Sequence, residues 1–188
     1  MPKAYIVAAV IAALLFAVIG AAGTSGPTDL TGKAVQLFDA NHAKLTVLIF
    51  VRTDCPISNR YAPELIRLYK EFSARAVFYL VYADPANTAG VIHQHMAEYG
   101  YTFGALRDPR HDLVKLAKAR VTPEAAVFSA SGQLLYHGRI DNRYVDFGKS
   151  MPQPTRRDLE EALRSVVAGK PVQLASTPAI GCFLADVQ

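Results

Sequence analysis

The chain contains no tryptophan and only two cysteines among its 188 residues. Those cysteines, Cys55 and Cys182, are far apart and do not form the paired C-x-x-C pattern of a structural zinc site. The sequence has no internal repeat, no low-complexity tract and no basic stripe interleaved with aromatic residues. These absences exclude a repeat architecture and make nucleic acid an unexpected partner. We also expect no cofactor and no bound metal.

The balance of residue types is that of a folded protein. Hydrophobic residues make up 51% of the chain and charged residues 19%, so extensive disorder is not expected. The net charge of +4 is spread along the chain. The densest basic pair, Arg156-Arg157, stands beside acidic residues and indicates a solvated helix face. A chain of this length accommodates one domain and a short leader.

The first thirty residues differ from the rest. Lys3 is the only charged residue before Asp29; an apolar run follows it, and small residues fill positions 20–26. This order is typical of a secretory signal, with cleavage after residue 22 or 23. The uncharged span is also long enough to cross a bilayer if it is retained. We therefore expect residues 1–23 to be a signal peptide or an N-terminal anchor. The body would then lie outside the cytoplasm, in the periplasm or another extracytoplasmic space, and touch a membrane only through this segment.

Alternating strands and helices are predicted in the body of the chain. Continuous β-branched and aromatic runs at 45–51 and 76–82 are typical of strands buried on both faces. A short first strand at 34–39 and a hairpin over 125–129 and 133–140 complete the predicted sheet, whereas 103–107 is ambiguous. Helical periodicity is found at 57–72, 88–99, 111–119 and 155–167.

Two positions bear on the helix boundaries. Pro63 is expected to kink the first helix or to mark its true start, and Thr155 is expected to cap the last. Residues 141–154 are expected to form a loop. The order of elements predicts an α/β sandwich with a mixed central sheet over residues 30–170. Residues 171–188 form a tail without a clear period, and this tail carries Cys182.

Cys55 is the candidate reactive group. It follows the first buried strand directly, and Pro56 suits the first turn of the helix that comes next. Free N–H groups at a helix start favour the thiolate, and Arg52 adds positive charge nearby, so we expect a pKa below about 8.5. A thiolate attacks disulfides and peroxides. Polar neighbours such as Ser58 favour an exposed, reactive cysteine over an inert core thiol.

The order of strand, Cys-Pro-x-x and helix, with Val-Thr-Pro before a later hairpin, resembles the thioredoxin superfamily. The resemblance implies a thioredoxin-like three-layer sandwich, here preceded by the signal or anchor segment. In that family a cis-proline faces the cysteine, which implies that Pro123 is cis and that Thr122 lines the substrate face with it. Pro56, Ser58 and Arg52 are implied to lie on the same face.

Within the superfamily the chain is similar to the redoxin branch, which includes the alkyl hydroperoxide reductase/thiol-specific antioxidant proteins. The similar stretches are 103–113, leading into the Val-Thr-Pro segment, and 55–65. The chain departs from three relatives. Thioredoxins have a second cysteine where Ser58 stands, and Sco-type copper proteins have one at Asn59. Peroxiredoxins place a proline and a Thr or Ser at the positions of Leu48 and Arg52.

Cys182 has three possible roles. It could fold back on Cys55 as a resolving cysteine, form a permanent disulfide with it, or remain a separate thiol. A permanent bond would close most of the domain and add about 4–5 kcal/mol in the chain-entropy model. A bond to a helix-start thiolate would be easier to reduce than a buried one.

Three functions remain open on this evidence. The first is an exported thiol-disulfide oxidoreductase, in which Cys55 attacks a disulfide of a partner protein and Cys182 or an external thiol resolves it. The second is a thiol peroxidase, in which a small hydroperoxide oxidises Cys55 to a sulfenic acid that condenses with Cys182. The third is a non-enzymatic protein that holds copper or another soft metal on the two thiols for delivery.

The remaining polar residues give weaker signals. His93 and His95 lie on different faces of a predicted helix, so they do not form a metal pair and are expected at the surface. His137 alternates with apolar residues in a predicted strand and is expected to face solvent. The charged and aromatic loop 139–147 could line the site or be an ordinary surface loop.

Overall fold

The computed structural model describes residues 26–40 and 44–184. Six strands form the main sheet in the order β1-β4-β3-β2-β6-β7. They span Thr28–Asp29 (β1), Leu45–Val51 (β2), Ala76–Tyr82 (β3), Gly104–Arg107 (β4), Glu124–Phe128 (β6) and Leu134–Gly138 (β7). Strands β2, β3 and β4 are parallel, while β6 is antiparallel to β2, β7 to β6 and β1 to β4. The predicted mixed sheet is therefore confirmed.

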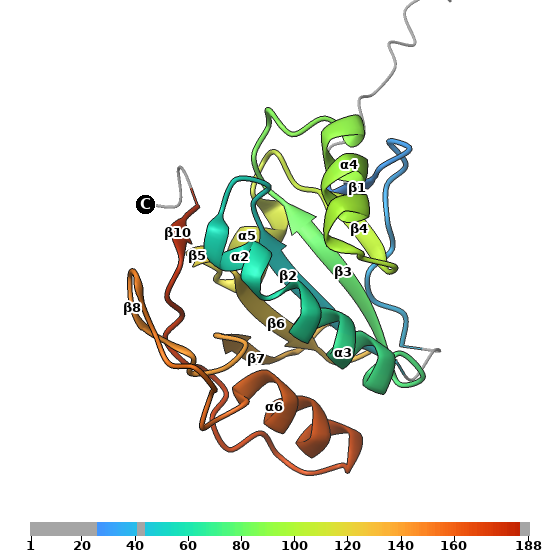
Figure 1. The fold of residues 1–188 in the computed structure, drawn as a ribbon. Helices are drawn as coiled ribbons and strands as arrows, with labels where there is room; N and C mark the ends of the chain where they lie inside the picture. The colour runs from blue at the N-terminus through green and yellow to red at the C-terminus, as the bar shows by residue number, and fades with distance from the viewer. Residues whose placement is uncertain (1–25, 41–43, 185–188) are drawn as a thin grey trace, which may run out of the picture.

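Helices cover both faces of this sheet. The helices span Pro56–Arg60 (α2), Ala62–Phe72 (α3), Ala89–Tyr99 (α4), Asp112–Ala117 (α5) and Asp158–Val167 (α6). Figure 1 shows α3 and α4 in front of the sheet and α5 behind it, with α6 beside β7. The result is the expected three-layer α/β sandwich. No helix within residues 26–40 and 44–184 is both long and apolar enough to cross a membrane, and the predicted signal or anchor segment lies outside the described residues.

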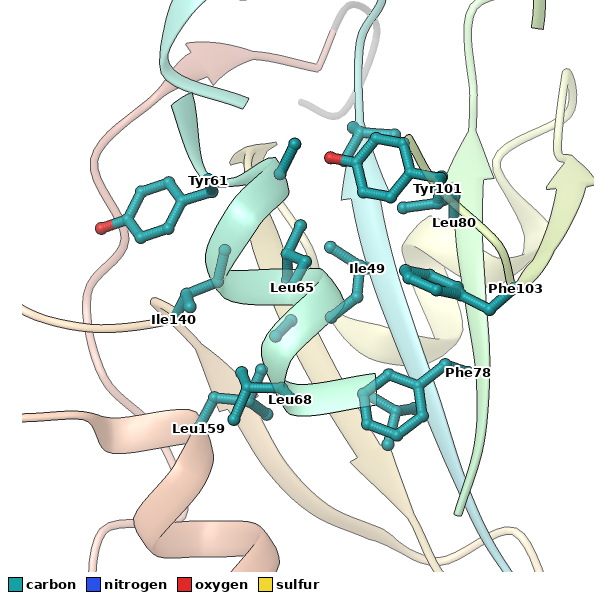
Figure 2. Packing of buried hydrophobic residues seen from close by; sticks show 14 of the residues in the cluster. Ile49, Tyr61, Leu65, Leu68, Phe78, Leu80, Tyr101, Phe103, Ile140 and Leu159 are labelled. Carbon is teal, nitrogen blue, oxygen red and sulfur yellow. The ribbon is translucent and has the colours of Figure 1, made fainter. Parts of the chain in front are cut away.

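Strand β2 is buried on both faces, as its sequence predicts. Val47 and Ile49 belong to the core on the α3 side, whereas Leu48 and Phe50 belong to the core on the α5 side. Figure 2 shows Ile49 packed on the α3 side among the side chains of α3, β3 and α6. A strand that is buried on both faces fixes the position of the segment that follows it.

Three local predictions about the N-terminal half have clear outcomes. The helix after β2 breaks at Tyr61, where α2 ends and α3 begins, because Pro63 occupies the first turn of α3. Residues 34–39 do not form the predicted strand. Both edges of β2 are already paired with β3 and β6, so this segment packs Leu37 and Phe38 against the α5-side core instead. The ambiguous stretch near residue 105 is strand β4.

The C-terminal half departs from prediction at two places. The predicted loop 141–154 contains a small hairpin, β8 (Tyr144–Asp146) with β9 (Lys149–Ser150). Helix α6 begins at Asp158, and Thr155 does not cap it. Asn142 holds Thr155 outside the helix, because its amide donates to the Thr155 hydroxyl at 2.7 Å and its carbonyl oxygen accepts from the Thr155 N–H at 2.9 Å.

The tail crosses the end of the molecule. Ser176 forms a bridge with His137 of β7, and Cys182–Phe183 forms strand β10, which pairs antiparallel with β5 (Val121–Thr122). Figure 1 shows the tail running past the β8 hairpin to reach β5 and the start of α2. Segments that are far apart in the sequence therefore meet at this end of the sheet.

Candidate active site

Cys55 occupies the N-cap position of α2, directly beyond the carboxyl end of β2. Its backbone is extended (φ −88°, ψ 110°), and its sulfur accepts a hydrogen bond from the Ser58 N–H at 3.5 Å. Pro56 fills the first helical position, as expected. The backbone N–H of Asn59 donates to the Cys55 carbonyl at 3.0 Å, which starts the helix. The short helix thus directs a donor at the sulfur, the polar contact that stabilises a thiolate.

The burial of Cys55 contradicts the sequence expectation of an exposed thiol. The residue is 0% exposed and belongs to the α3-side core. The Cys55 thiol donates to the Thr122 carbonyl at 3.2 Å. Its polar sequence neighbours misled the prediction because Asp54 points outward, while the sulfur points inward beneath the tail. The sulfur is nevertheless not enclosed by hydrocarbon alone, since it has polar contacts on both sides.

A cis peptide bond joins Thr122 and Pro123 across from Cys55, as the family resemblance implied. Thr122 is 0% exposed, and its carbonyl is the acceptor for the Cys55 thiol. The predicted pair therefore lies against the predicted nucleophile. Cis bonds are uncommon even before proline, so this agreement is specific.

Cys182 also lies at this site. In the antiparallel pairing of β10 with β5, Cys182 stands opposite Thr122. The Cys182 side chain lies close enough to the Cys55 sulfur for each thiol to shift the pKa of the other, and both residues are free thiols. Cys182 is partly exposed, in contrast to Cys55. Of the three roles left open, the structure favours those that place the two sulfurs together.

Gly181 makes this approach possible. A Cβ atom at that position would lie 2.1 Å from the Thr122 carbonyl oxygen, a separation that no side chain tolerates. The tail makes a similar close contact at Thr177, nearer its beginning. A Cβ on Gly138 of β7 would lie 2.2 Å from the Thr177 carbonyl oxygen. Gly138 also has a φ of +142°, which favours glycine. Two glycines therefore set how closely the tail can dock.

The two thiols have opposite shifts in acidity. Burial raises the pKa of Cys55, but hydrogen bonds from Cys182 and Ser58 outweigh it, and the net pKa lies below the ordinary value. Burial and the hydrogen bond to Cys55 raise the pKa of Cys182 to about 11. At neutral pH Cys182 is therefore a thiol that donates to the Cys55 sulfur. The thiolate form is thus favoured at Cys55 relative to an ordinary cysteine and disfavoured at Cys182.

The other predicted site residues, Ser58 and Arg52, surround the pair. The Ser58 hydroxyl is buried without a hydrogen bond of good geometry to any described group, and it lies close enough to Cys55 to lower the pKa of that thiol. Arg52 donates to both carboxylate oxygens of Asp54, at 3.0 and 2.8 Å, and to the Phe183 carbonyl at 3.3 Å. Arg52 therefore ties the strand that precedes Cys55 to the tail that follows Cys182.

A buried histidine supports the loop before the site, and the sequence did not reveal it. His95 is 4% exposed, which corrects the prediction of a surface histidine, whereas His93 is exposed as predicted. The His95 ring contacts the Tyr82 hydroxyl at 2.8 Å and the Asn59 carbonyl oxygen at 2.9 Å. Asn59 in turn donates to the Thr53 carbonyl at 3.1 Å. A four-residue polar network thus joins β3 and α4 to α2 and to the loop that precedes it.

A shallow pocket of about 260 Å³ lies beside the helix start. Its lining residues come from α2 and the β8 hairpin: Pro56, Ile57, Arg60, Tyr144, Phe147, Gly148 and Ser150. The loop that the sequence left undecided thus borders the site, and Phe147 is 66% exposed there. His137 is only partly exposed, with 24% of its side chain accessible, and it lies 3.7 Å from Glu124. Within the described ranges no group of three or more His, Cys, Asp or Glu residues could hold a metal ion.

A mixed sheet between helical layers, with a helix-capping cysteine facing a cis-proline, defines a thioredoxin-fold protein. The model of the AhpC/TSA family matches residues 21–137, well over half of the sequence, and the chain belongs to this family. No curated protein matches the sequence.

Solved structures agree with this fold. An uncharacterized conserved protein from Geobacillus kaustophilus is 25% identical, with a TM-score of 0.72 over 84% of this chain and 86% of its own. A hypothetical protein from Sinorhizobium meliloti is 22% identical, with a TM-score of 0.66 over 85% of this chain and 93% of its own. A secreted Mycobacterium tuberculosis disulfide oxidoreductase homologous to E. coli DsbE is 18% identical, with a TM-score of 0.51 over 74% and 93% of the two chains.

Proposed function

We propose that this protein is an exported thiol-disulfide oxidoreductase that cycles between a Cys55–Cys182 dithiol and a Cys55–Cys182 disulfide. The observation that carries the proposal is the β10–β5 pairing, which holds Cys182 opposite Thr122 and against the Cys55 sulfur. The family match and the fold of the solved disulfide oxidoreductase are consistent with it. Export rests on the composition of the first 23 residues.

The chemistry assigns Cys55 as the nucleophile that closes the disulfide. Its thiolate attacks the Cys182 sulfur of a mixed disulfide between Cys182 and the partner, and the partner sulfur leaves as a thiolate. In one half of the cycle an external disulfide is reduced to two thiols while the protein dithiol is oxidised, and in the other half the protein disulfide is reduced by two external thiols. The buried Thr122 carbonyl and Pro123 set the direction from which Cys182 approaches.

The experiment is a pair of activity measurements on the mature chain. Oxidation with diamide followed by mass spectrometry should reveal an intramolecular Cys55–Cys182 disulfide. Reduction or oxidation of a model peptide should be lost in both Cys55→Ser and Cys182→Ser. A Ser73→Ala variant, which alters a hydroxyl far from both sulfurs in the sequence, serves as the control. Wild-type protein that forms no such disulfide contradicts the proposal.

A peroxide assay separates the second chemistry. Peroxide consumption that is lost in Cys55→Ser, without exchange on a model disulfide, would replace the proposal with a thiol peroxidase. Leu48 faces the α5-side core and Arg52 pairs with Asp54, so neither supplies the proline or hydroxyl that peroxiredoxins place there. Exchange rather than peroxide reduction is therefore the expected outcome.

A further inference from the structure

The two sulfurs of the proposed redox pair are not equally accessible. Cys55 is 0% exposed, whereas Cys182 is partly exposed and its neighbour Phe183 is 80% exposed. Thr122 covers one side of the Cys55 sulfur, and the docked tail covers another. An external thiol or disulfide therefore cannot touch Cys55 while the tail is in place.

The contacts that seat the tail are numerous. The Leu184 N–H donates to the Arg120 carbonyl at 3.0 Å, and the Leu184 side chain is only 7% exposed against the α5-side core. The Arg52 guanidinium holds the Phe183 carbonyl at 3.3 Å. At Gly181 the backbone of the tail lies so close to the Thr122 carbonyl that only glycine fits. The tail is thus a paired strand and not a loose cover over Cys55.

We propose that external partners exchange with this protein at Cys182, with Cys55 as the internal sulfur, and that the oxidised protein accepts electrons from partner thiols. This inference rests on the proposed function and deepens it, because it names the sulfur that is attacked and the class of substrate. In the order expected from the sequence, Cys55, the cysteine of the Cys-Pro-x-x motif, reacts with the partner first. In the present proposal Cys182 reacts first.

The reaction balances as follows. A partner thiolate attacks the Cys182 sulfur of the disulfide, forming a partner–Cys182 bond and breaking the Cys55–Cys182 bond, and Cys55 leaves as a thiolate. A second partner thiol then attacks the partner sulfur of that mixed disulfide. Cys182 leaves and takes up the proton that the second thiol releases. Two partner thiols become one disulfide, and the protein disulfide becomes two cysteines.

The contacts around Cys55 favour this direction. A leaving thiolate departs faster when its conjugate thiol is more acidic. In the reduced protein the Cys55 sulfur accepts a hydrogen bond from the Ser58 N–H at 3.5 Å, and the adjacent Cys182 and Ser58 side chains lower its pKa. Cys182 has no such support, since its pKa is raised to about 11. Stabilising the reduced form makes a disulfide a stronger oxidant.

The test locates the first mixed disulfide. Oxidised mature protein is mixed with reduced glutathione, quenched in acid within a second and mapped by mass spectrometry. We expect the glutathione adduct on Cys182 to exceed the adduct on Cys55 by about tenfold or more, because attack at a buried sulfur is slow. An adduct that is mainly on Cys55, or shared equally, overturns the inference and leaves the proposed function intact. Absence of the starting disulfide overturns both.

Two variants sharpen this result. Gly181→Ala should displace the tail and shift the adduct toward Cys55, because its Cβ would collide with the Thr122 carbonyl oxygen. Gly90→Ala is the matched control, since its Cβ would meet only Thr88 Oγ1, at an ordinary 3.9 Å. An adduct distribution that does not differ between the two variants contradicts the role given to the docked tail.

The direction of electron transfer is tested by the equilibrium between the protein disulfide and reduced glutathione. Oxidised protein titrated with reduced glutathione should become mainly reduced, and Ser58→Ala should lower the reduced fraction at a given glutathione concentration, because the Ser58 side chain helps to lower the pKa of Cys55. Ser73→Ala is again the control. A protein that keeps its disulfide in excess reduced glutathione would overturn the assignment as an oxidant of thiols.

Discussion

The two cysteines occupy regions that are built in different ways. Cys55 lies at the end of β2, a strand buried on both faces, and at the start of a helix whose cap it forms. Cys182 lies in a tail without regular periodicity, held by single strand pairings and by two glycine contacts. The first region is fixed by hydrophobic burial and the second by close backbone approach. One site thus combines a rigid half, fixed by core packing, with a half that is held in place by the docking of the tail.

The largest effect on disulfide formation is expected at Gly138, where the tail makes its second close glycine contact. Gly138→Ala places a Cβ 2.2 Å from the Thr177 carbonyl oxygen and adds strain at a φ of +142°. We expect the rate of Cys55–Cys182 disulfide formation to fall by about tenfold or more, because the effective concentration of Cys182 falls. Diamide oxidation followed by thiol counting measures this rate.

Gly148→Ala is the matched control for that variant. Gly148 also has a positive φ, of +78°, but its Cβ would meet nothing within 4 Å. Strain alone should therefore leave disulfide formation close to the wild-type rate. Equal slowing in Gly138→Ala and Gly148→Ala would show that the tail is not seated by close contact.

The rigid half should respond mainly in global stability. Tyr82→Phe removes the hydroxyl that contacts His95 at 2.8 Å and leaves a buried ring nitrogen without that partner. We expect a loss of about 1–3 kcal/mol in the free energy of unfolding, measured by urea denaturation. His93→Gln, on the exposed side of the same helix, should change it little. If Tyr82→Phe slowed disulfide formation but left the free energy of unfolding unchanged, the distinction between the two halves would be wrong.

Acid should also weaken the rigid half. Burial lowers the pKa of His95 below its ordinary value, so the unfolded chain binds a proton there that the folded protein does not. Stability from this group is therefore full above about pH 6.5 and is lost as the pH falls below that value. Urea unfolding at pH 7.5 and pH 5.5 should show a smaller difference in His95→Gln than in the wild type. An equal loss of stability between pH 7.5 and pH 5.5 in the wild type and in His95→Gln would contradict this account.

A smaller effect is expected on the pKa of Cys55, which depends on the neighbouring Cys182 of the tail. The Cys182 thiol donates to the Cys55 sulfur, so Cys182→Ala should raise the pKa of Cys55, and Cys182→Ser, which retains a donor, should raise it less. Thiolate absorbance at 240 nm against pH measures both in the reduced protein. The thiolate fraction near neutral pH should therefore be lowest in Cys182→Ala. Identical titrations would mean that the tail does not contribute to the acidity of Cys55.

The smallest effect is expected at Arg52. Arg52→Gln removes the ion pair with the exposed Asp54 and the hydrogen bond to the Phe183 carbonyl. Exposed ion pairs contribute about 0–1 kcal/mol, so global stability should barely change. Hydrogen exchange at the Leu184 amide, which pairs with Arg120, should become faster because the tail is less firmly held. Unchanged exchange would show that Arg52 does not secure the tail.

The sequence predicted most of the fold and part of the site. Continuous apolar runs identified β2 and β3, and a proline explained the break between α2 and α3. Family resemblance placed Pro123 opposite Cys55. The strand expected at 34–39 failed because pairing depends on which sheet edges are free, and a single segment does not record that.

Sequence alone determined that Cys55 follows a buried strand and caps a helix, because hydrophobic runs and helix-start residues act locally. Only the tertiary structure decided that this sulfur is covered, that His95 is internal and that Cys182 lies beside it. The reason is physical: these features depend on contacts between separate segments, which are 36 residues apart for His95 and Asn59 and 67 residues apart for Cys55 and Thr122. The position of Cys182 further depends on the close fit of two glycines, Gly138 and Gly181, which leaves no periodic pattern in a sequence.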